Sequence, residues 1–271
     1  MTRASKRGWK YSLIMDVSRF PLVPGPSPML VTHSKGVWLH TSDGRRILDA
    51  GGGAIVTNIG HGRQEIAQVA ADALSHLDYV VPVFATESRV GLVEEVSDHW
   101  LPDPSWRCVF VSGGSESVDA ALRVAQLHHV ACGRPERHKG IGRDVSYHGA
   151  TVGALAAGSH DRRRKGLEQL LPSMPKTSHR DPEELEKVIE IEGAETISAF
   201  IGEPVIGAAA GAYVPPDNYW TRISEICAQH DILVIADEVM TGFGRLGATM
   251  GHEALGFTPD IIAAGKGLGG G

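Results

Sequence analysis

The sequence predicts an α/β protein built on a mostly parallel sheet with helices on both faces. Short runs of apolar and β-branched residues alternate with segments whose apolar residues recur at helical spacing. The runs at 232–239 and 260–266 are apolar almost throughout, as expected of strands buried on both faces. Strands that alternate with helices are typical of parallel sheets with crossover helices.

The N-terminal region reads differently. Residues 1–60 look irregular, with prolines crowded before residue 29, but "GVWLHTSDGRRILDA" (36–50) predicts a hairpin that turns at Asp43-Gly44. The segment 63–77 predicts a helix, because its apolar residues share one face: Ile66, Val69, Ala70, Ala73, Leu74 and Leu77.

From residue 107 the pattern becomes strand, glycine turn and helix. "RCVFV" (107–111) predicts a short buried strand, "SGGSE" a tight turn, and "SVDAALRVAQLHH" (117–129) a helix. "RDVSYHGAT" (143–151) predicts a second strand and loop, and 181–189 a helix capped by Asp181 with Pro182 in its first turn. The remaining predicted elements are a strand with a polar loop at 197–207, a helix at 217–230, and strands at 232–239 and 260–266.

Composition narrows the function classes. The chain has 271 residues, 42% of them hydrophobic and 21% charged, with a net charge of −6. No basic face dominates, so we expect neither nucleic acid nor an anionic membrane as a partner, and "RRRK" (162–165) is interpreted as a solvated loop. Three cysteines far apart in sequence predict a reducing, cytoplasmic environment. No apolar run is long enough to cross a membrane.

Polar residues follow the predicted strands, where parallel sheets bind ligands. "VFVSGGSES" places a glycine turn before a helix, which suits a phosphate group. Asp237 and Lys266 each end an apolar run; either is equally well explained as a structural ion pair, helix cap or snorkelling surface residue. One hypothesis explains all three features: pyridoxal 5′-phosphate (PLP), with its phosphate on the 113–115 turn, its aldehyde on Lys266 and its ring nitrogen on Asp237.

Five motifs, in order, resemble the signatures of class III aminotransferases, which are PLP-dependent enzymes of fold type I. They are "FVSGGSESVDAALRVAQ", "SYHGAT", "IGEPVIG", "IADEVMTGFGR" and "PDIIAAGKGLGGG". "LDAGGGAIVTNIGHG" (48–62) resembles the N-terminal segment of the family. The resemblance covers nearly the whole chain after about residue 20.

The resemblance implies a role for each site residue. Lys266 is expected to be the Schiff-base lysine and proton shuttle, and Asp237 to pair with the pyridine nitrogen. Tyr147 would stack on the ring with His148 beside it, Glu203 would lie near the ring, and Val239 would pack on the opposite face. The phosphate would lie on Gly113, Gly114 and Ser115. The expected reaction is a ping-pong transfer of an amino group from a small amine or amino acid to a keto or aldehyde acceptor.

The resemblance also implies a domain organisation. Residues 1–60 would belong to a small domain and 61–271 to a three-layer, PLP-binding large domain. Members of the family continue past the lysine, so we expect this chain to correspond to an N-terminal portion without the C-terminal small domain. The active site of the family lies in a homodimer, so a homodimer is expected if that part is supplied. An open sheet edge and uncovered apolar surface predict marginal stability for the chain alone.

Four alternatives remain open from the residues. "GFGRLG" (242–247) matches a dinucleotide-binding pattern, although "DEVMT" separates it from the preceding strand. Thirteen histidines raise the question of a metal enzyme, although no pair has metal-ligand spacing. The chain is alternatively a non-catalytic remnant of an aminotransferase. Finally, a lyase or mutase would use the same cofactor.

Overall fold

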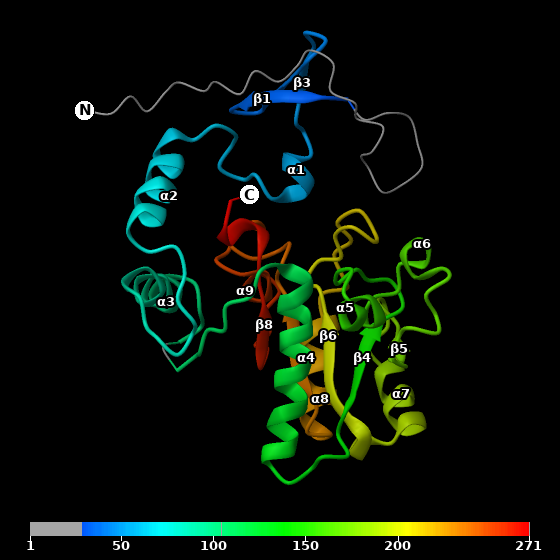
Figure 1. Ribbon diagram of the computed structural model, residues 1–271. Helices are drawn as coiled ribbons and strands as arrows, with labels where there is room; N and C mark the ends of the chain where they lie inside the picture. Colours follow the sequence, from blue (N-terminus) through cyan, green and yellow to red (C-terminus); the bar gives the residue numbers. More distant parts are fainter. Residues whose placement is uncertain (1–28, 104, 271) are drawn as a thin grey trace, which may run out of the picture. The chain divides into compact units, whose positions relative to one another are not determined.

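The computed structural model describes residues 29–103 and 105–270. These residues divide into two compact units, with the boundary between Val80 and Val81 (Figure 1). The prolines before residue 29 lie outside the described residues. The boundary that the resemblance implies, at residue 60, stays a prediction.

The first unit holds the predicted hairpin. β2 (Trp38–Thr41) and β3 (Arg46–Leu48) are antiparallel, and β1 (Val31–Lys35) adds a third strand in the order β1-β2-β3. Gly44 takes a φ of +84° in the turn, which glycine adopts without strain. The hairpin is therefore confirmed, and β1 is an addition that the sequence did not predict.

The described residues of the first unit also form the helices α1 (Gly52–Ile55) and α2 (Gln64–His76). α2 confirms the predicted helix. Its apolar face is nevertheless uncovered, since Ile66 is 50%, Val69 66% and Leu74 67% exposed. The spacing of apolar residues thus predicted the element but not its burial.

The second unit is built on five parallel strands in the order β5-β4-β6-β7-β8. Three of these observed strands lie within the ranges predicted for strands: 197–207, 232–239 and 260–266. The bounds are β4 (Lys139–Arg143), β5 (Lys176–Thr177), β6 (Ile197–Gly202), β7 (Leu233–Asp237) and β8 (Ile261–Ala263). The predicted parallel sheet is therefore confirmed.

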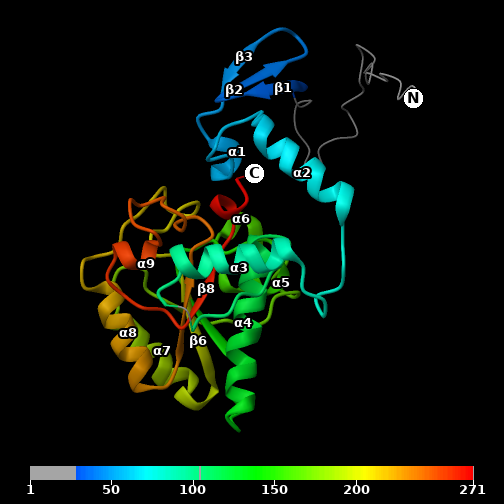
Figure 2. The same ribbon diagram turned by 90° about the vertical axis from the view of Figure 1, so that its left-hand side faces the viewer.

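Helices cover both faces of this sheet, which gives three layers (Figures 1 and 2). α4 (Gly114–Ala131) and α5 (Val152–Ala157) pack on one face, where Ala199 and Ile201 of β6 point. α7 (Glu184–Glu192) and α8 (Tyr219–Gln229) pack on the other. Further elements are α3 (Glu87–His99), α6 (Asp161–Arg164), α9 (Gly251–Ala254) and the short turns η1 (Ala194–Thr196) and η2 (Lys266–Leu268).

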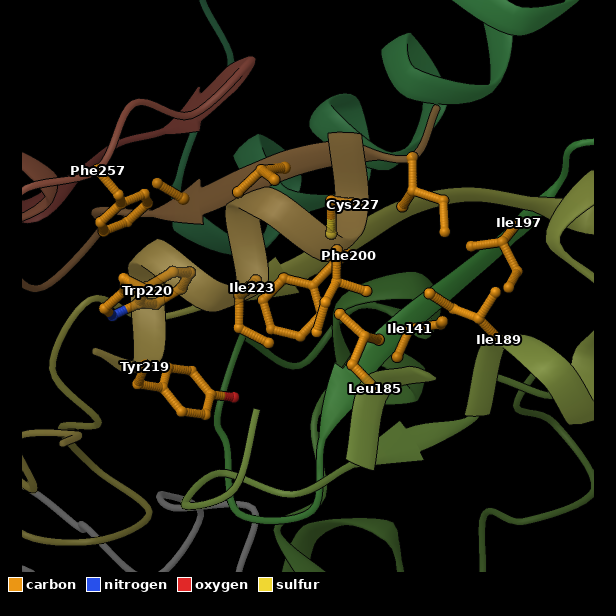
Figure 3. Packing of buried hydrophobic residues seen from close by; sticks show 14 residues of the cluster. Ile141, Leu185, Ile189, Ile197, Phe200, Tyr219, Trp220, Ile223, Cys227 and Phe257 are labelled. Carbon is orange, nitrogen blue, oxygen red and sulfur yellow. The ribbon is translucent and has the colours of Figure 1, made fainter. Parts of the chain in front are cut away.

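The larger apolar cluster lies between the sheet and the α7–α8 layer (Figure 3). The ring of Trp220 stacks on Phe257 with centroids 4.0 Å apart and meets Phe200 edge-on at 6.0 Å. Ile223 and Cys227, one and two turns further along α8, are fully buried in the same cluster. Phe200 of β6 and Val234 of β7 belong to this cluster, which therefore anchors both strands. Within the described ranges, no helix has the length and apolar character needed to cross a membrane.

The predicted strand at 107–111 is wrong. These residues form no strand pairing in the described part, and Val109 is 66% and Phe110 45% exposed. A cavity of about 500 Å³ is lined both by this segment and by Asp260–Ile262 of the β8 region. A strand needs a neighbouring backbone at hydrogen-bonding distance, and here the cavity lies where that neighbour would be.

Two other boundaries differ from expectation. The strand predicted within 143–151 is wrong, because the strand in this region is β4, which ends at Arg143, and 144–151 is a loop. α7 begins at Glu184, because the residues around Pro182 form a turn before it.

Candidate functional site

The carboxyl ends of the parallel strands carry the polar residues. β4 ends at Arg143, Glu203 follows β6, β7 ends at Asp237, and Lys266 comes shortly after β8. Parallel strands end at the same edge of a sheet, where α/β proteins bind ligands. The fold therefore gathers at one edge residues that are far apart in sequence.

Asp237 and His148 form a buried pair at this edge. Asp237 Oδ2 and His148 Nδ1 lie 2.6 Å apart, and both residues are 3% exposed. Asp237 Oδ1 accepts a hydrogen bond from the backbone N–H of Val239 at 3.1 Å. Two partners offset the cost of burying this carboxylate. In the described part of the chain, His148 Nε2 is buried without a hydrogen-bond partner.

Glu203 is a second buried carboxyl group at this edge. Its Oε2 accepts a hydrogen bond from the backbone N–H of Tyr147 at 3.1 Å, and its Oε1 accepts one from Gly207 at 3.1 Å. Burial raises the pKa of Glu203, and the charge of Asp237 raises it further, against the opposing influence of His148 and Arg143. Glu203 and Asp237 therefore influence each other electrostatically.

Arg143, at the end of β4, binds the backbone at the end of β6. Its side chain is fully buried, and Nη2 donates to the carbonyl oxygen of Glu203 at 2.5 Å. Its guanidinium lies 5.4 Å from the ring centroid of Trp220 and 5.9 Å from that of Tyr219. The sequence did not single out Arg143. Its position at the end of a strand was missed, because the predicted strand begins at Arg143 instead of ending there.

Tyr147 lies in the loop after β4. The guanidinium of Arg163 is 4.8 Å from the centroid of its ring, and the ring of His160 meets it edge-on at 6.4 Å. Arg163 belongs to the "RRRK" run, so part of that run contacts a candidate site residue rather than solvent alone.

The glycine turn 113–115 begins α4 and is tied to the loop after His148. Ser115 Oγ accepts a hydrogen bond from the backbone N–H of Ala150 at 3.0 Å, and Thr151 Oγ1 donates to the carbonyl oxygen of Ser115 at 3.3 Å. A β-carbon placed on Gly114 would lie only 2.7 Å from Cγ1 of Val239. The glycine turn is thus in direct contact with Val239, two residues after the end of β7.

The Lys266 loop reaches the same turn. Gly265 packs against Gly114 and Val239, since a β-carbon on Gly265 would lie 3.6 Å from Gly114 Cα and 3.5 Å from Val239 Cγ1. The backbone N–H of Ala264 donates to Ser117 Oγ of α4 at 3.1 Å. Lys266 itself is half-buried and has a φ of +43°, which is strained for a residue with a side chain.

The structure thus forms two linked groups. Asp237, His148 and Glu203 make the first, and the second joins the glycine turn to Val239 and the Lys266 loop, through contacts that sequence alone does not give. The residues of this edge that sequence reasoning missed are Arg143 and Ser117. The roles of the predicted residues toward a cofactor stay predictions.

Two alternatives lose support from the geometry. The glycine-rich segment 242–247 forms successive turns between β7 and α9, and α9 has four residues, so no long helix follows the glycines as dinucleotide binding requires. Among residues 29–103 and 105–270, no group of three or more His, Cys, Asp or Glu side chains is placed to hold a metal ion.

Comparisons with known proteins agree on one family. A model of the family "Aminotransferase class-III" matches residues 23–271. The chain is 34% identical over 266 residues to the omega-aminotransferase of Caulobacter vibrioides, covering 89% of this chain and 59% of that protein. It is 34% identical over 258 residues to the putrescine–pyruvate aminotransferase of Pseudomonas aeruginosa, covering 88% and 56%.

A solved structure gives the same answer. The chain superposes on an (S)-enantioselective omega-transaminase from Thermomicrobium roseum with a TM-score of 0.87 and 34% identity, over 94% of this chain and 63% of that one. The chain thus spans less than two thirds of the length of these relatives. The family match over 23–271, together with this likeness of fold, places the chain in the class III aminotransferase family.

Proposed function

We propose that the carboxyl edge of the sheet binds PLP and that the protein is a transaminase. The reaction would move an amino group from an amine or amino acid donor to a keto or aldehyde acceptor in two half-reactions. The observation that carries the proposal is the buried Asp237–His148 pair, whose members lie 2.6 Å apart beside a glycine turn and a lysine loop. The protonated ring nitrogen of PLP would give the Asp237 carboxylate a cationic partner in addition to its contacts with His148 and the Val239 N–H.

We expect each part of this cofactor to meet residues of this edge. α4 has 18 residues, and its first N–H groups at Gly113, Gly114 and Ser115 would bind the phosphate dianion at the positive end of the helix dipole. Tyr147 and Val239 would pack on opposite faces of the ring. When bound, PLP supplies an electron sink for the amino carbon of the substrate.

The side chains of this protein would then hold and transfer the protons of the reaction. Asp237 would keep a proton on the ring nitrogen, and His148 would orient Asp237 through its Nδ1 contact. Lys266 would hold the cofactor covalently through Nζ, and its free amine would carry a proton to and from the substrate α-carbon. Glu203, whose pKa is raised first by burial, would lie near the ring.

A half-reaction tests this function. The chain loaded with PLP and mixed with a primary amine donor is expected to release the matching carbonyl compound, up to one equivalent per site, detected by mass spectrometry. Lys266→Ala is the matched control and is expected to release none. Release of a decarboxylated, eliminated or rearranged product would instead identify a lyase or mutase.

The non-catalytic remnant is favoured by a different observation. The cavity between 107–111 and β8 and the exposed Val109 leave the β8 edge of the sheet open. A chain that binds PLP through Lys266 but releases no carbonyl product would support the remnant over the enzyme.

The proposal also covers the substrates, the oligomeric state and the cellular compartment of the protein. The donor and acceptor are small molecules, and a homodimer in the cytoplasm is expected. The homodimer is expected from the family, and the cytoplasm from the use of cysteine. Sedimentation of the purified chain tests the homodimer.

A further inference from the structure

Glu238, the residue after Asp237, is fully buried and has no part in the proposed chemistry. Its backbone N–H donates to the carbonyl oxygen of Ala263 in β8 at 2.8 Å. Its carbonyl oxygen accepts a hydrogen bond from Gly242 at 2.9 Å. The backbone of Glu238 therefore connects the end of β7, the neighbouring strand and the turn that follows.

The carboxylate of Glu238 accepts four hydrogen bonds. Oε1 accepts from the backbone N–H of His252 at 2.7 Å and from its Nδ1 at 2.9 Å. Oε2 accepts from the backbone N–H of Gly251 at 2.9 Å and from the hydroxyl of Thr241. We call Glu238, Thr241, Gly251 and His252 the Glu238 cluster.

The cluster holds an ionised acid. Burial by itself raises the pKa of Glu238, but the hydrogen bonds from His252 and Thr241 and from the backbone outweigh burial, so the pKa lies below its ordinary value. The ionised carboxylate cannot donate, so Nδ1 of His252 carries the proton that it shares with Oε1. Because every acceptor position is used, moving any one partner would leave a buried charge short of a donor.

The segment restrained by this cluster carries two candidate site residues. The N–H of Val239 donates to Asp237 Oδ1 at 3.1 Å, and Val239 packs between Gly114 and Gly265. Glu238 lies between these two residues in sequence, with its side chain directed to α9 instead of the site. A shift of Glu238 would therefore move both Asp237 and Val239.

We propose that the Glu238 cluster is a positioning device that fixes Asp237 and Val239 for cofactor binding. This inference rests on the proposed PLP site. Glu238 is a positioning residue and not a catalytic one, because it acts through its neighbours in the chain. The cofactor affinity would depend on the number of donors around its carboxylate.

The first experiment measures PLP affinity of the full chain by visible absorbance. Glu238→Gln keeps the shape but replaces one acceptor oxygen with a donor, so we expect the dissociation constant to rise at least about tenfold. His252→Asn keeps a side-chain N–H near the position of Nδ1, whereas His252→Leu removes it. Near-normal affinity in His252→Asn and a loss in His252→Leu would show that the donor matters and not the bulk.

A remote variant separates positioning from general destabilisation. Ile189→Ala creates a cavity in the apolar cluster between α7 and the sheet, away from the Glu238 cluster and the strand ends. We expect it to lower the melting temperature without changing the PLP dissociation constant. Equal loss of affinity in Ile189→Ala, or unchanged affinity in Glu238→Gln, would overturn the proposal.

Hydrogen exchange of the cofactor-free chain gives a readout that does not need PLP. In Glu238→Gln, exchange is expected to speed up across 237–252 and to stay unchanged in β4 and α7. Unchanged exchange across 237–252 would overturn the inference. Failure of the unmodified chain to bind PLP would count against the proposed function, while the exchange result would still decide the role of the cluster.

Discussion

The contact between Gly114 and Val239 shows how single residues hold the site together. A methyl group on Gly114 would lie 2.7 Å from Cγ1 and 3.2 Å from Cγ2 of Val239. Both distances are shorter than ordinary van der Waals contact, so either the glycine turn or the end of β7 would have to move. This explains why glycine suits position 114, where the turn needs close approach more than backbone freedom.

Gly114→Ala is expected to weaken PLP binding and to lower the free energy of unfolding by about 1–3 kcal/mol through overpacking. Val239→Ala removes both γ-carbons, so the double variant should recover part of both losses. PLP titration and urea unfolding of the four proteins measure the coupling. Strictly additive losses would show that the two residues do not meet in the folded chain.

At the scale of elements, two cations close the C-terminal end of α5, the helix after the Tyr147 loop. Lys176 Nζ donates to the carbonyl oxygens of Ala156 at 2.7 Å and Ala157 at 2.5 Å, and Arg164 Nη1 also donates to Ala156 at 3.0 Å. Cations at this end of a helix satisfy its last carbonyls. Burial, and then the charge of Arg164, lower the pKa of Lys176 to about 7.

This shift sets a pH dependence. Folding lowers the pKa of Lys176 from 10.5, so between pH 10.5 and about 7 the folded chain binds fewer protons than the unfolded chain. The free energy of unfolding should therefore rise with pH across that window. Urea titrations at several pH values should show this contribution disappear in Lys176→Met and persist in Lys165→Met, a substitution of a neighbouring exposed lysine. The same pH dependence in both variants would contradict the assignment.

Elements with strong apolar periodicity were predictable from the sequence. The helices at 63–77 and 217–230 and the strands ending at Gly202 and Asp237 follow from it. β4 was missed because "KGIGR" has one large apolar residue between two glycines. The strand at 107–111 was predicted wrongly because an apolar run does not report whether a partner strand lies beside it.

In the candidate site, too, some features were predictable from the sequence and others were not. The positions of Asp237 and Lys266 at strand ends were predictable, because each is a charged residue that ends an apolar run. The link from Glu238 to His252 crosses a loop without regular structure, and the link from Ser117 to Ala264 joins residues 147 positions apart. Tertiary contacts of this kind leave no local pattern in a single sequence.

At the scale of the whole molecule, the exposed segment 107–111 and the cavity of about 500 Å³ beside β8 favour marginal stability. We expect the purified chain to bind a hydrophobic dye such as anilinonaphthalene sulfonate and to melt over a broad range. Phe110→Lys should reduce dye binding, because Phe110 lines the cavity. Ile191→Lys, at an 80% exposed position on α7, is the control and should reduce it less. A cooperative melt at high temperature without dye binding would contradict this expectation.

The central claim is that this chain assembles a PLP pocket around Lys266. Its most direct test is the visible absorbance spectrum of the purified chain with PLP, recorded beside Lys266→Ala. We expect a saturable band in the unmodified chain that is lost in the variant. No band, or an equal band in both proteins, would contradict the claim and show that the strand ends do not form a working cofactor site.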